Sequence, residues 1–331
     1  MADSTRESKR RVIVLGTGGT IAGRAASARD NIGYTAGQVG VTELLEGIEA
    51  PPGAAVQTEQ VAQVDSKDMS FPIWRRLAER CAHWLAEPDV AGLVITHGTD
   101  TLEETAFFLQ SVLAPAKPVV VTCAMRPATA LTPDGPQNVR DAMAVALSPE
   151  ARGVTVVCAG QVHSAFDVQK IHTYRIDAFS SGDAGPVAYV EEGVLRALRP
   201  WPFSPPDPAR QAFERMARAA RWPRVEILLS HAEAGGGVIR ALVAQRAAGD
   251  EDAVQGLVLA ATGNGTLHEA LEAAALQAQG AGIMVVRATR CMQGRILPTP
   301  GAALRDAGGL TPVKARIALI LELMASGVGT S

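Results

Sequence analysis

Short apolar runs alternate with segments of helical periodicity along most of the chain. In the first half, the apolar runs cover residues 12–15, 92–96, 118–123 and 153–158. Between them, apolar side chains recur three and four positions apart over residues 71–87, 101–113 and 137–147. Continuous apolar runs are typical of parallel strands buried on both faces, and their alternation with helices is typical of βαβ units. The first half is therefore predicted to form an α/β domain with a parallel sheet.

A proline-rich segment separates this series from a second one. Prolines crowd the stretch from Arg199 to Pro208, and because proline excludes regular structure we predict an interdomain linker over residues 199–222. After it, strands are predicted at 225–230, 256–261 and 282–287, and helices at 238–248, 267–279 and 312–324. At 331 residues the chain exceeds the usual size of one core. The predicted domains are residues 1–198 and 223–331.

Composition and charge exclude several classes of partner. Apolar residues make up 47% of the chain and the net charge is −3, so no basic surface for nucleic acid is expected. The polar start lacks a secretory core, and no segment approaches the length of a membrane span. The four cysteines lie far apart, and three of them lie in or beside apolar strand or helix patterns, which is typical of buried, reduced thiols. We expect a soluble cytoplasmic enzyme without metal or cofactor, although an exported protein that has lost its leader stays open.

Two short loops rich in glycine and threonine follow predicted strands. Residues 17–22 read Thr-Gly-Gly-Thr-Ile-Ala, and residues 96–101 read Thr-His-Gly-Thr-Asp-Thr. Ligands bind at the carboxyl edge of an open parallel sheet, where both loops emerge. Threonines there beside Asp100 predict a hydrolase site with a nucleophile. A dinucleotide fingerprint fails because Ile21 occupies its third glycine position. A nucleotide-binding or regulatory α/β protein is the alternative from another class.

Part of the second loop is explained by the start of a helix. Thr101 and Glu104 have the spacing of a capping box, and acidic residues 103 and 104 favour the positive end of the helix dipole. Capping leaves Thr99 and Asp100 unexplained, and a threonine hydroxyl becomes a useful nucleophile only beside an activating base. His97 lies between a strand end and a glycine, where we expect a structural histidine.

Further motifs extend the pattern along nearly the whole chain. They lie at residues 65–69, 124–127, 134–138, 167–170, 263–265 and 310–316. Together with the two loops, they make the chain resemble the bacterial-type L-asparaginase and glutaminase-asparaginase family. The resemblance implies a larger N-terminal flavodoxin-like domain with a parallel sheet and a smaller C-terminal α/β domain, with no cofactor.

The same resemblance implies hydrolysis of L-asparagine to L-aspartate and ammonia through an acyl-enzyme on threonine. Thr20 matches the primary nucleophile, and Tyr34 matches the tyrosine on a mobile flap that helps to activate it. Thr99, Asp100 and Lys170 match a second threonine–aspartate–lysine triad. These assignments are expectations carried over from the family onto the matching positions.

The resemblance also implies substrate-binding residues, which are Asp65, Ser66, Thr99, Asp100, Ala124 and Asn264. Ser66 and Asp100 match the groups that hold the α-carboxylate and α-amino group of an amino-acid amide. The Ala124 carbonyl matches the group that binds the amide nitrogen. Asn264 matches a residue that reaches into a partner subunit's site, and the resemblance also implies a homotetramer of two dimers with shared sites.

Two departures from the family pattern leave substrate choice open. Lys67 stands where many exported members have glutamine, and we expect it to favour the substrate carboxylate or to turn to solvent. No acid lies in residues 292–305, where the family's cross-subunit glutamate falls, so a group from residues 163–166 or from the partner is expected to replace it. The alternatives are a glutaminase-asparaginase with relaxed substrate choice and the asparaginase-like subunit of a tRNA-dependent amidotransferase.

Overall fold

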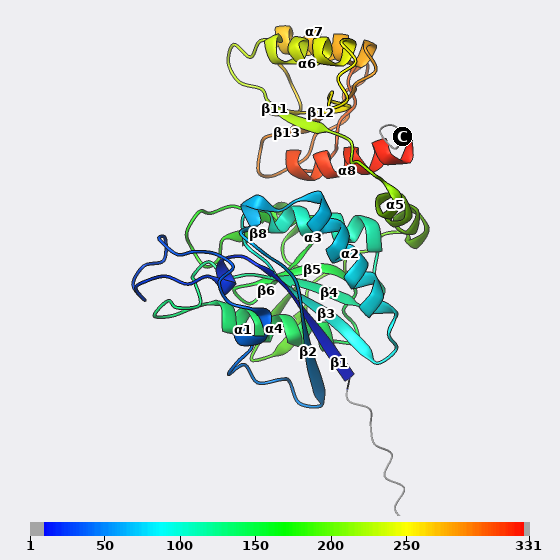
Figure 1. Cartoon of the computed structure of the whole chain (residues 1–331). Helices are drawn as coiled ribbons and strands as arrows, with labels where there is room; N and C mark the ends of the chain where they lie inside the picture. Colours follow the sequence, from blue (N-terminus) through cyan, green and yellow to red (C-terminus); the bar gives the residue numbers. More distant parts are fainter. Residues whose placement is uncertain (1–9, 328–331) are drawn as a thin grey trace, which may run out of the picture. The chain divides into compact units, whose positions relative to one another are not determined.

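The computed structural model describes residues 10–327, so the polar start of the chain (residues 1–9) and residues 328–331 lie outside the described part. The chain divides into two compact units, Met1–Arg210 and Gln211–Ser331. The first contains an eight-stranded sheet and the second a three-stranded sheet, each with helices packed on it (Figure 1). The predicted α/β class, with a larger N-terminal and a smaller C-terminal sheet domain, is confirmed.

The parallel part of the large sheet has the strand order β2-β1-β3-β4-β5. Its strands are β1 (Arg10–Gly18), β2 (Ala54–Val64), β3 (Val90–Thr96), β4 (Pro118–Thr122) and β5 (Gly153–Cys158). In this flavodoxin-like order the connections reverse direction between β1 and β3. In such sheets ligands bind where the strand order reverses, and here that point is the carboxyl ends of these two strands, where the two glycine–threonine loops begin.

The rest of the large sheet is antiparallel. Its strands are β6 (Gln161–Ser164), β9 (Ala188–Glu191) and β10 (Val194–Ala197), each antiparallel to its neighbour. The predicted parallel sheet is therefore a mixed one. A separate hairpin pairs two very short strands, β7 (Gln169–Lys170) and β8 (Phe179–Ser180). The sequence pattern missed β6 to β10 because each of these strands has at most four residues, and it missed β2 because polar residues interrupt that edge strand.

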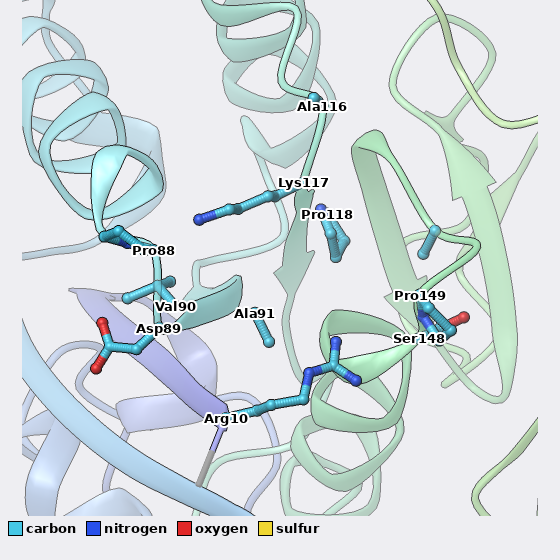
Figure 2. Close-up of a pocket in the computed structure, with 11 residues that line it drawn as sticks. Arg10, Pro88, Asp89, Val90, Ala91, Ala116, Lys117, Pro118, Ser148 and Pro149 are labelled. Atoms are coloured by element: carbon cyan, nitrogen blue, oxygen red, sulfur yellow. The ribbon is translucent and has the colours of Figure 1, made fainter. Parts of the chain in front are cut away.

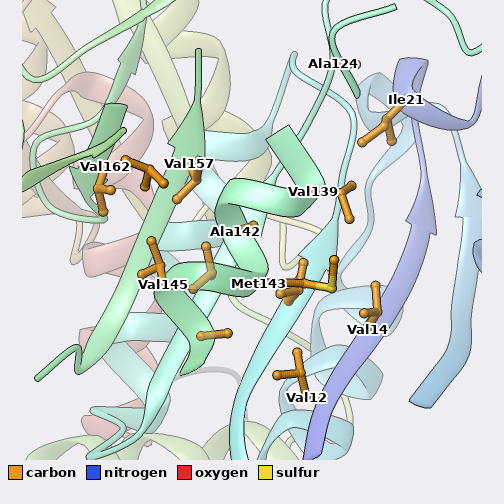
Figure 3. Packing of buried hydrophobic residues seen from close by; sticks show 14 of the residues in the cluster. Val12, Val14, Ile21, Ala124, Val139, Ala142, Met143, Val145, Val157 and Val162 are labelled. Atoms are coloured by element: carbon orange, nitrogen blue, oxygen red, sulfur yellow. The ribbon is translucent and has the colours of Figure 1, made fainter. Parts of the chain in front are cut away.

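Helices cover both faces of the parallel strands (Figure 1). On one face lie α2 (Phe71–Ala86) and α3 (Leu102–Leu113), and on the other α1 (Val41–Leu44) and α4 (Gly135–Leu147). Figure 3 shows Val12 and Val14 of β1 in one apolar cluster with Val139 and Met143 of α4. Because side chains alternate along a strand, Ile13 faces the opposite helices. All three β1 residues are fully buried, which explains the continuous apolar run.

The second unit is a small parallel α/β layer. Its sheet has the order β11-β12-β13, with strands Val225–Leu229, Gly256–Ala261 and Met284–Thr289. Helices α6 (Gly237–Ala247) and α7 (Glu269–Gly280) pack against each other on one face, and α8 (Pro312–Ala325) packs across all three strands on the other (Figure 1). The helix and strand predictions for this half agree with the structure to within a few residues.

The segment predicted to be a linker contains a helix, so the expectation of no regular structure there is wrong. Helix α5 spans Pro206–Arg218, and the division between the two units falls within it, after Arg210. Pro206 and Pro208 occupy its first turn, where backbone N–H groups have no partner inside the helix. At these positions the prolines therefore mark the start of a helix and do not exclude one.

A buried chain of hydrogen bonds supports the loop that follows β3. The indole N–H of Trp74 donates to Thr105 Oγ1 at 2.8 Å, and the Thr105 hydroxyl lies 2.9 Å from Nε2 of His97. The Gly98 carbonyl can only accept, so Nδ1–H of His97 donates to it at 2.7 Å, and Nε2 of the neutral ring accepts from the Thr105 hydroxyl. Burial lowers the pKa of His97 to about 4. His97 is thus a neutral residue that holds the loop backbone, as expected for a structural histidine.

We predict that His97 makes stability fall as the pH drops below 6.5. Its folded pKa is about 4 against 6.5 in the unfolded chain, so between these values the unfolded state binds the extra proton. The contribution of His97 to the free energy of unfolding is therefore fully present above pH 6.5 and is lost progressively toward pH 4, by at most about 3 kcal/mol. Urea unfolding of wild type and His97→Asn at several pH values measures the difference. An identical pH dependence in both proteins would contradict the prediction.

Candidate active site

The two glycine–threonine loops touch through their backbones at the carboxyl edge of the large sheet. A Cβ added to Gly19 would overlap the backbone of Gly98, which leaves room only for glycine. Gly19 also has a φ of 82°, in the left-handed region that favours glycine. Thr20 and Thr99 each directly follow one of these glycines. The contact therefore brings two threonines from neighbouring strands to one place, as the sequence predicted for this edge.

Thr20 and Tyr34 form the first group of the candidate site. Thr20 is 6% exposed, and its hydroxyl lies 2.6 Å from the Tyr34 hydroxyl. An isolated antiparallel β-bridge between Arg24 and Thr35 brings the chain back toward Thr20, so that Tyr34, next to Thr35, lies beside the threonine. Burial raises the pKa of Tyr34 in spite of its hydrogen bond with Thr20. Tyr34 is therefore a neutral phenol at neutral pH, suited to relaying a proton rather than to acting as a resting phenolate.

Lys170 links Thr99 and Asp100 in a second group. Its ammonium donates to Thr99 Oγ1 at 2.8 Å and to Asp100 Oδ1 at 2.6 Å. The Lys170 side chain is 19% exposed and that of Asp100 is 54% exposed, so the carboxylate faces the open side. Because the Thr99 oxygen accepts from Lys170, its own proton is left to donate to a ligand. The structure thus brings together the three residues of the expected triad.

The helix that follows the second loop begins differently from the predicted capping box. The Thr101 hydroxyl donates to the Ser66 carbonyl at 2.7 Å instead of capping α3. Glu103 Oε1 accepts from the backbone N–H of Lys170 at 3.2 Å, a contact beyond the helix-dipole role expected for it. These partners lie 35 and 67 residues away in the sequence, so local spacing could not reveal them.

Ser66 and Asp65 lie beside the second loop, with Lys67 next to them. Ser66 is 2% exposed, and its Oγ accepts from the backbone N–H of Asp100 at 3.1 Å, so its own O–H can still donate. The Lys67 ammonium lies 2.8 Å from Asp65 Oδ2 and 3.1 Å from Asp68 Oδ2, on a side chain that is 61% exposed. Of the two expectations for Lys67, the structure shows the one in which it turns to solvent, paired with these carboxylates.

Ala124 lies just beyond β4, fully buried beside the strand that carries the second loop. Asp134 and Asn138, at the start of α4, hydrogen-bond the backbone on both sides of it. Sequence reasoning recognised their motif but assigned them no role. One signal in the sequence could have indicated their role. Asp134 stands just before a predicted helix, and only a short loop separates it from Ala124, the candidate substrate-binding residue.

Two expectations involve residues outside this group. Asn264 belongs to the second unit, where its side-chain amide donates to the Leu297 carbonyl at 3.3 Å and accepts from the Leu297 N–H at 2.7 Å. Its role toward a partner's site stays a prediction. Of residues 163–166, His163 lies in β6 opposite Val156 of β5. The His163 side chain is buried against Ser181, so it does not supply the missing substrate-facing group.

The expectations about thiols, metals and membranes can be compared with the described residues. Cys81, Cys123 and Cys158 are buried, and Cys291 is exposed. Within residues 10–327, we find no cluster of three or more histidine, cysteine or acidic side chains that could hold a metal ion. None of the helices in that part of the chain is long and apolar enough to cross a membrane.

A separate cavity of about 330 Å³ lies at the opposite edge of the sheet (Figure 2). Its lining includes Arg10, Asp89 and Lys117, together with Val90 and Pro118, the first residues of β3 and β4. Because these strands are parallel, their first residues lie at the edge remote from the loops that follow them. This cavity therefore takes no part in the chemistry of the threonine loops.

Comparisons with known proteins identify the family to which the chain is similar. The family model "Asparaginase, N-terminal" matches residues 11–202, and the model "Glutaminase/Asparaginase C-terminal domain" matches residues 224–327. The chain is 36% identical to L-asparaginase 2 of Bacillus subtilis (strain 168), over 94% of this chain and 81% of that protein. It is 34% identical to the glutaminase-asparaginase of Pseudomonas fluorescens biotype A, over 96% of this chain and 88% of that protein. A solved structure, the probable cytoplasmic L-asparaginase of Campylobacter jejuni, superposes with a TM-score of 0.85 at 33% identity, covering 97% of this chain and 98% of that one.

We predict that Gly19→Ala disrupts the site, whereas Gly47→Ala does not. The two glycines have nearly the same φ, 82° and 80°, so both substitutions carry a backbone penalty of about 1 kcal/mol or more, and it is larger at Gly19, whose ψ of −172° falls in a region essentially limited to glycine. A Cβ at position 47 meets open space, but one at position 19 overlaps Gly98. Denaturant unfolding should show a larger destabilisation for Gly19→Ala, with loss of any activity of the site. Equal effects of the two substitutions would show that the loops do not need this contact.

Proposed function

This chain belongs to the asparaginase family of amide hydrolases, and from that premise we propose that it converts L-asparagine and water to L-aspartate and ammonia. The observation that carries the proposal is the pairing of two threonine hydroxyls with proton-handling partners at one sheet edge. Thr20 contacts Tyr34, and Thr99 contacts Lys170. A nucleophile next to a proton relay, beside a second hydroxyl backed by a cation, suits acyl transfer.

In the first half-reaction, Thr20 Oγ forms a bond to the amide carbon, and its proton leaves through Tyr34. The carbonyl oxygen becomes an oxyanion, stabilised by the Thr99 hydroxyl and by backbone N–H groups of the two loops. When the C–N bond breaks, the nitrogen takes up the relayed proton and leaves as ammonia. The aspartyl group stays on Thr20 as an ester.

In the second half-reaction, water attacks the carbon of this ester. The water loses a proton, the bond from carbon to Thr20 Oγ breaks, and the threonine oxygen regains a proton through Tyr34. L-aspartate is released and the enzyme returns to its starting state. The Lys170 ammonium keeps Thr99 oriented as a donor in both halves, because the Thr99 oxygen accepts from it throughout.

Recognition of an amino-acid amide follows from the groups that surround these hydroxyls. The Ser66 hydroxyl can donate to the substrate α-carboxylate. Asp100 uses Oδ1 for Lys170 and is more than half exposed, so its other oxygen can accept from the α-ammonium group. In this proposal the Ala124 carbonyl accepts from the amide nitrogen. These roles follow the family resemblance and are compatible with the hydrogen bonds described above.

A second candidate is a glutaminase-asparaginase with relaxed substrate choice. It is favoured by Lys67, whose charge is taken up by Asp65 and Asp68, so the position offers no amide to a substrate. The Pseudomonas fluorescens relative carries the name of such an enzyme.

The proposal also includes assembly and location. A homotetramer of two dimers, with Asn264 acting in a partner's site, rests on the family resemblance. A cytoplasmic location has the support of the Campylobacter jejuni structure, which is described as a probable cytoplasmic L-asparaginase.

We predict that Thr20→Ala and Lys170→Met each abolish turnover while the fold is kept. The first removes the nucleophile, and the second removes the cation that orients Thr99. Ammonia release is measured with L-Asn, L-Gln and D-Asn over a range of concentrations, with melting curves to check folding. Lys117→Met, a change of the same kind at the opposite sheet edge, should leave turnover unchanged. Ammonia release retained in Thr20→Ala or Lys170→Met would refute the assignment of that residue.

We predict that Lys67→Gln lowers KM for amides that carry an α-ammonium group. The substitution removes a positive charge near Asp100 and frees Asp65, so repulsion of the ammonium decreases. Since Lys67 is largely exposed, the change in KM should be modest, about twofold to fivefold. Succinamate, which lacks the α-amino group, serves as the control and should show no improvement. The same decrease for both substrates would mean that Lys67 does not act on the ammonium.

A further inference from the structure

Asp134 occupies the N-cap position of α4, yet its carboxylate serves a different part of the chain. An aspartate at an N-cap usually accepts from N–H groups in the first turn of its own helix. Here Oδ2 accepts from the backbone N–H of Met125 at 2.9 Å, and Oδ1 accepts from that of Arg126 at 3.0 Å. Both carboxylate oxygens thus accept from the two residues that follow Ala124, and Oδ2 also accepts a longer hydrogen bond, at 3.4 Å, from Nδ2 of Asn138.

The bond to Met125 fixes the direction of the Ala124 carbonyl. The C=O of Ala124 and the N–H of Met125 belong to one peptide unit, and the structure has only trans peptide bonds within residues 10–327. In a planar trans unit these two groups point in opposite directions. Since the N–H points at Asp134, the carbonyl points away from Asp134 and from the start of α4.

The peptide that precedes Ala124 is held from the same helix. Asn138, which is 2% exposed, donates through Nδ2 to the Cys123 carbonyl at 3.0 Å and accepts through Oδ1 from the Ala159 N–H at 3.0 Å. It therefore joins the ends of β4 and β5. The first turn of α4 fixes the segment on both sides of the Ala124 carbonyl.

The same turn of α4 also contacts the nucleophile loop. A Cβ added to Gly135 would lie 2.9 Å from the side chain of Ile21 and 3.5 Å from Cβ of Ala124. Ile21 directly follows Thr20. One helix start is therefore packed against both the loop that carries the expected nucleophile and the residue whose carbonyl is expected to receive the leaving group.

We propose that Asp134 is a positioning residue that orients the Ala124 carbonyl toward the nitrogen of the scissile amide, with Asn138 holding the preceding peptide. The proposal rests on the amide hydrolysis proposed above. A carboxylate that accepts from the N–H of a peptide also polarises its carbonyl, which makes the oxygen a stronger acceptor. The nitrogen becomes a better donor as it gains a proton, so this contact strengthens toward the transition state.

The test compares an amide with an ester of the same acyl group. L-asparagine and the β-methyl ester of L-aspartate give the same acyl-enzyme, but the leaving oxygen of the ester carries no hydrogen of its own to donate to Ala124. In Asp134→Asn, one acceptor oxygen remains for two backbone N–H groups and the Asn138 amide. We expect kcat/KM for L-asparagine to fall about tenfold or more, and kcat/KM for the ester to stay within about threefold of wild type.

Asp141→Asn is the matched control. Asp141 is a buried acid two turns further along α4, and it accepts from Gln137 instead of from the loop after β4. Its substitution should leave the ratio of amide to ester hydrolysis unchanged. If Asp134→Asn does not fold, Asp134→Glu keeps the charge, displaces the carboxylate by one methylene and should show the same amide-selective loss.

Equal losses for amide and ester in a folded Asp134 variant, or no loss for either, would overturn the orienting role while leaving the hydrolase assignment intact. A wild-type protein that hydrolyses neither substrate would instead overturn the proposed function, and with it this inference.

Discussion

The candidate site depends on the backbone contact between Gly19 and Gly98. The two loops emerge from neighbouring strands where the strand order reverses, and they approach so closely that a side chain on either glycine would strike the other loop or Ser66. Each glycine is followed at once by a threonine, so the contact sets the relation between Thr20 and Thr99. Two short loops thus determine where a substrate carbonyl would be attacked.

The pattern of the sequence predicted this framework because its central strands are buried on both faces. β1 and β3 each contain an unbroken apolar run, and the polar residues that follow these runs had to lie at one sheet edge. The family resemblance, which the comparisons confirm, then supplied roles for these residues. The strand order itself could not be read from the pattern, because β2 lies at the sheet edge and carries polar side chains at many positions.

The sequence was least informative where distant contacts override a local rule. Thr101 has the spacing of a cap but donates to Ser66, and Asp134 stands at an N-cap but accepts from a loop. Lys170 sits in a two-residue strand and meets Thr99, 71 residues away. No periodicity marks such a lysine, so only the family resemblance could single it out. Residues that hold a site together are recognised by their partners, which the fold alone supplies.

The electrostatic difference between the two threonine groups suggests how they would divide the chemistry. Tyr34 beside Thr20 is held neutral by burial, so this pair can exchange a proton without creating a lasting charge. Lys170 places a cation against Thr99 and pairs with an exposed Asp100. A cation behind a hydroxyl favours a developing oxyanion, and an exposed carboxylate favours an ammonium group. An amide substrate with an α-ammonium group would therefore lie with its carbonyl between the threonines, where the oxyanion develops, and its α-amino group toward Asp100.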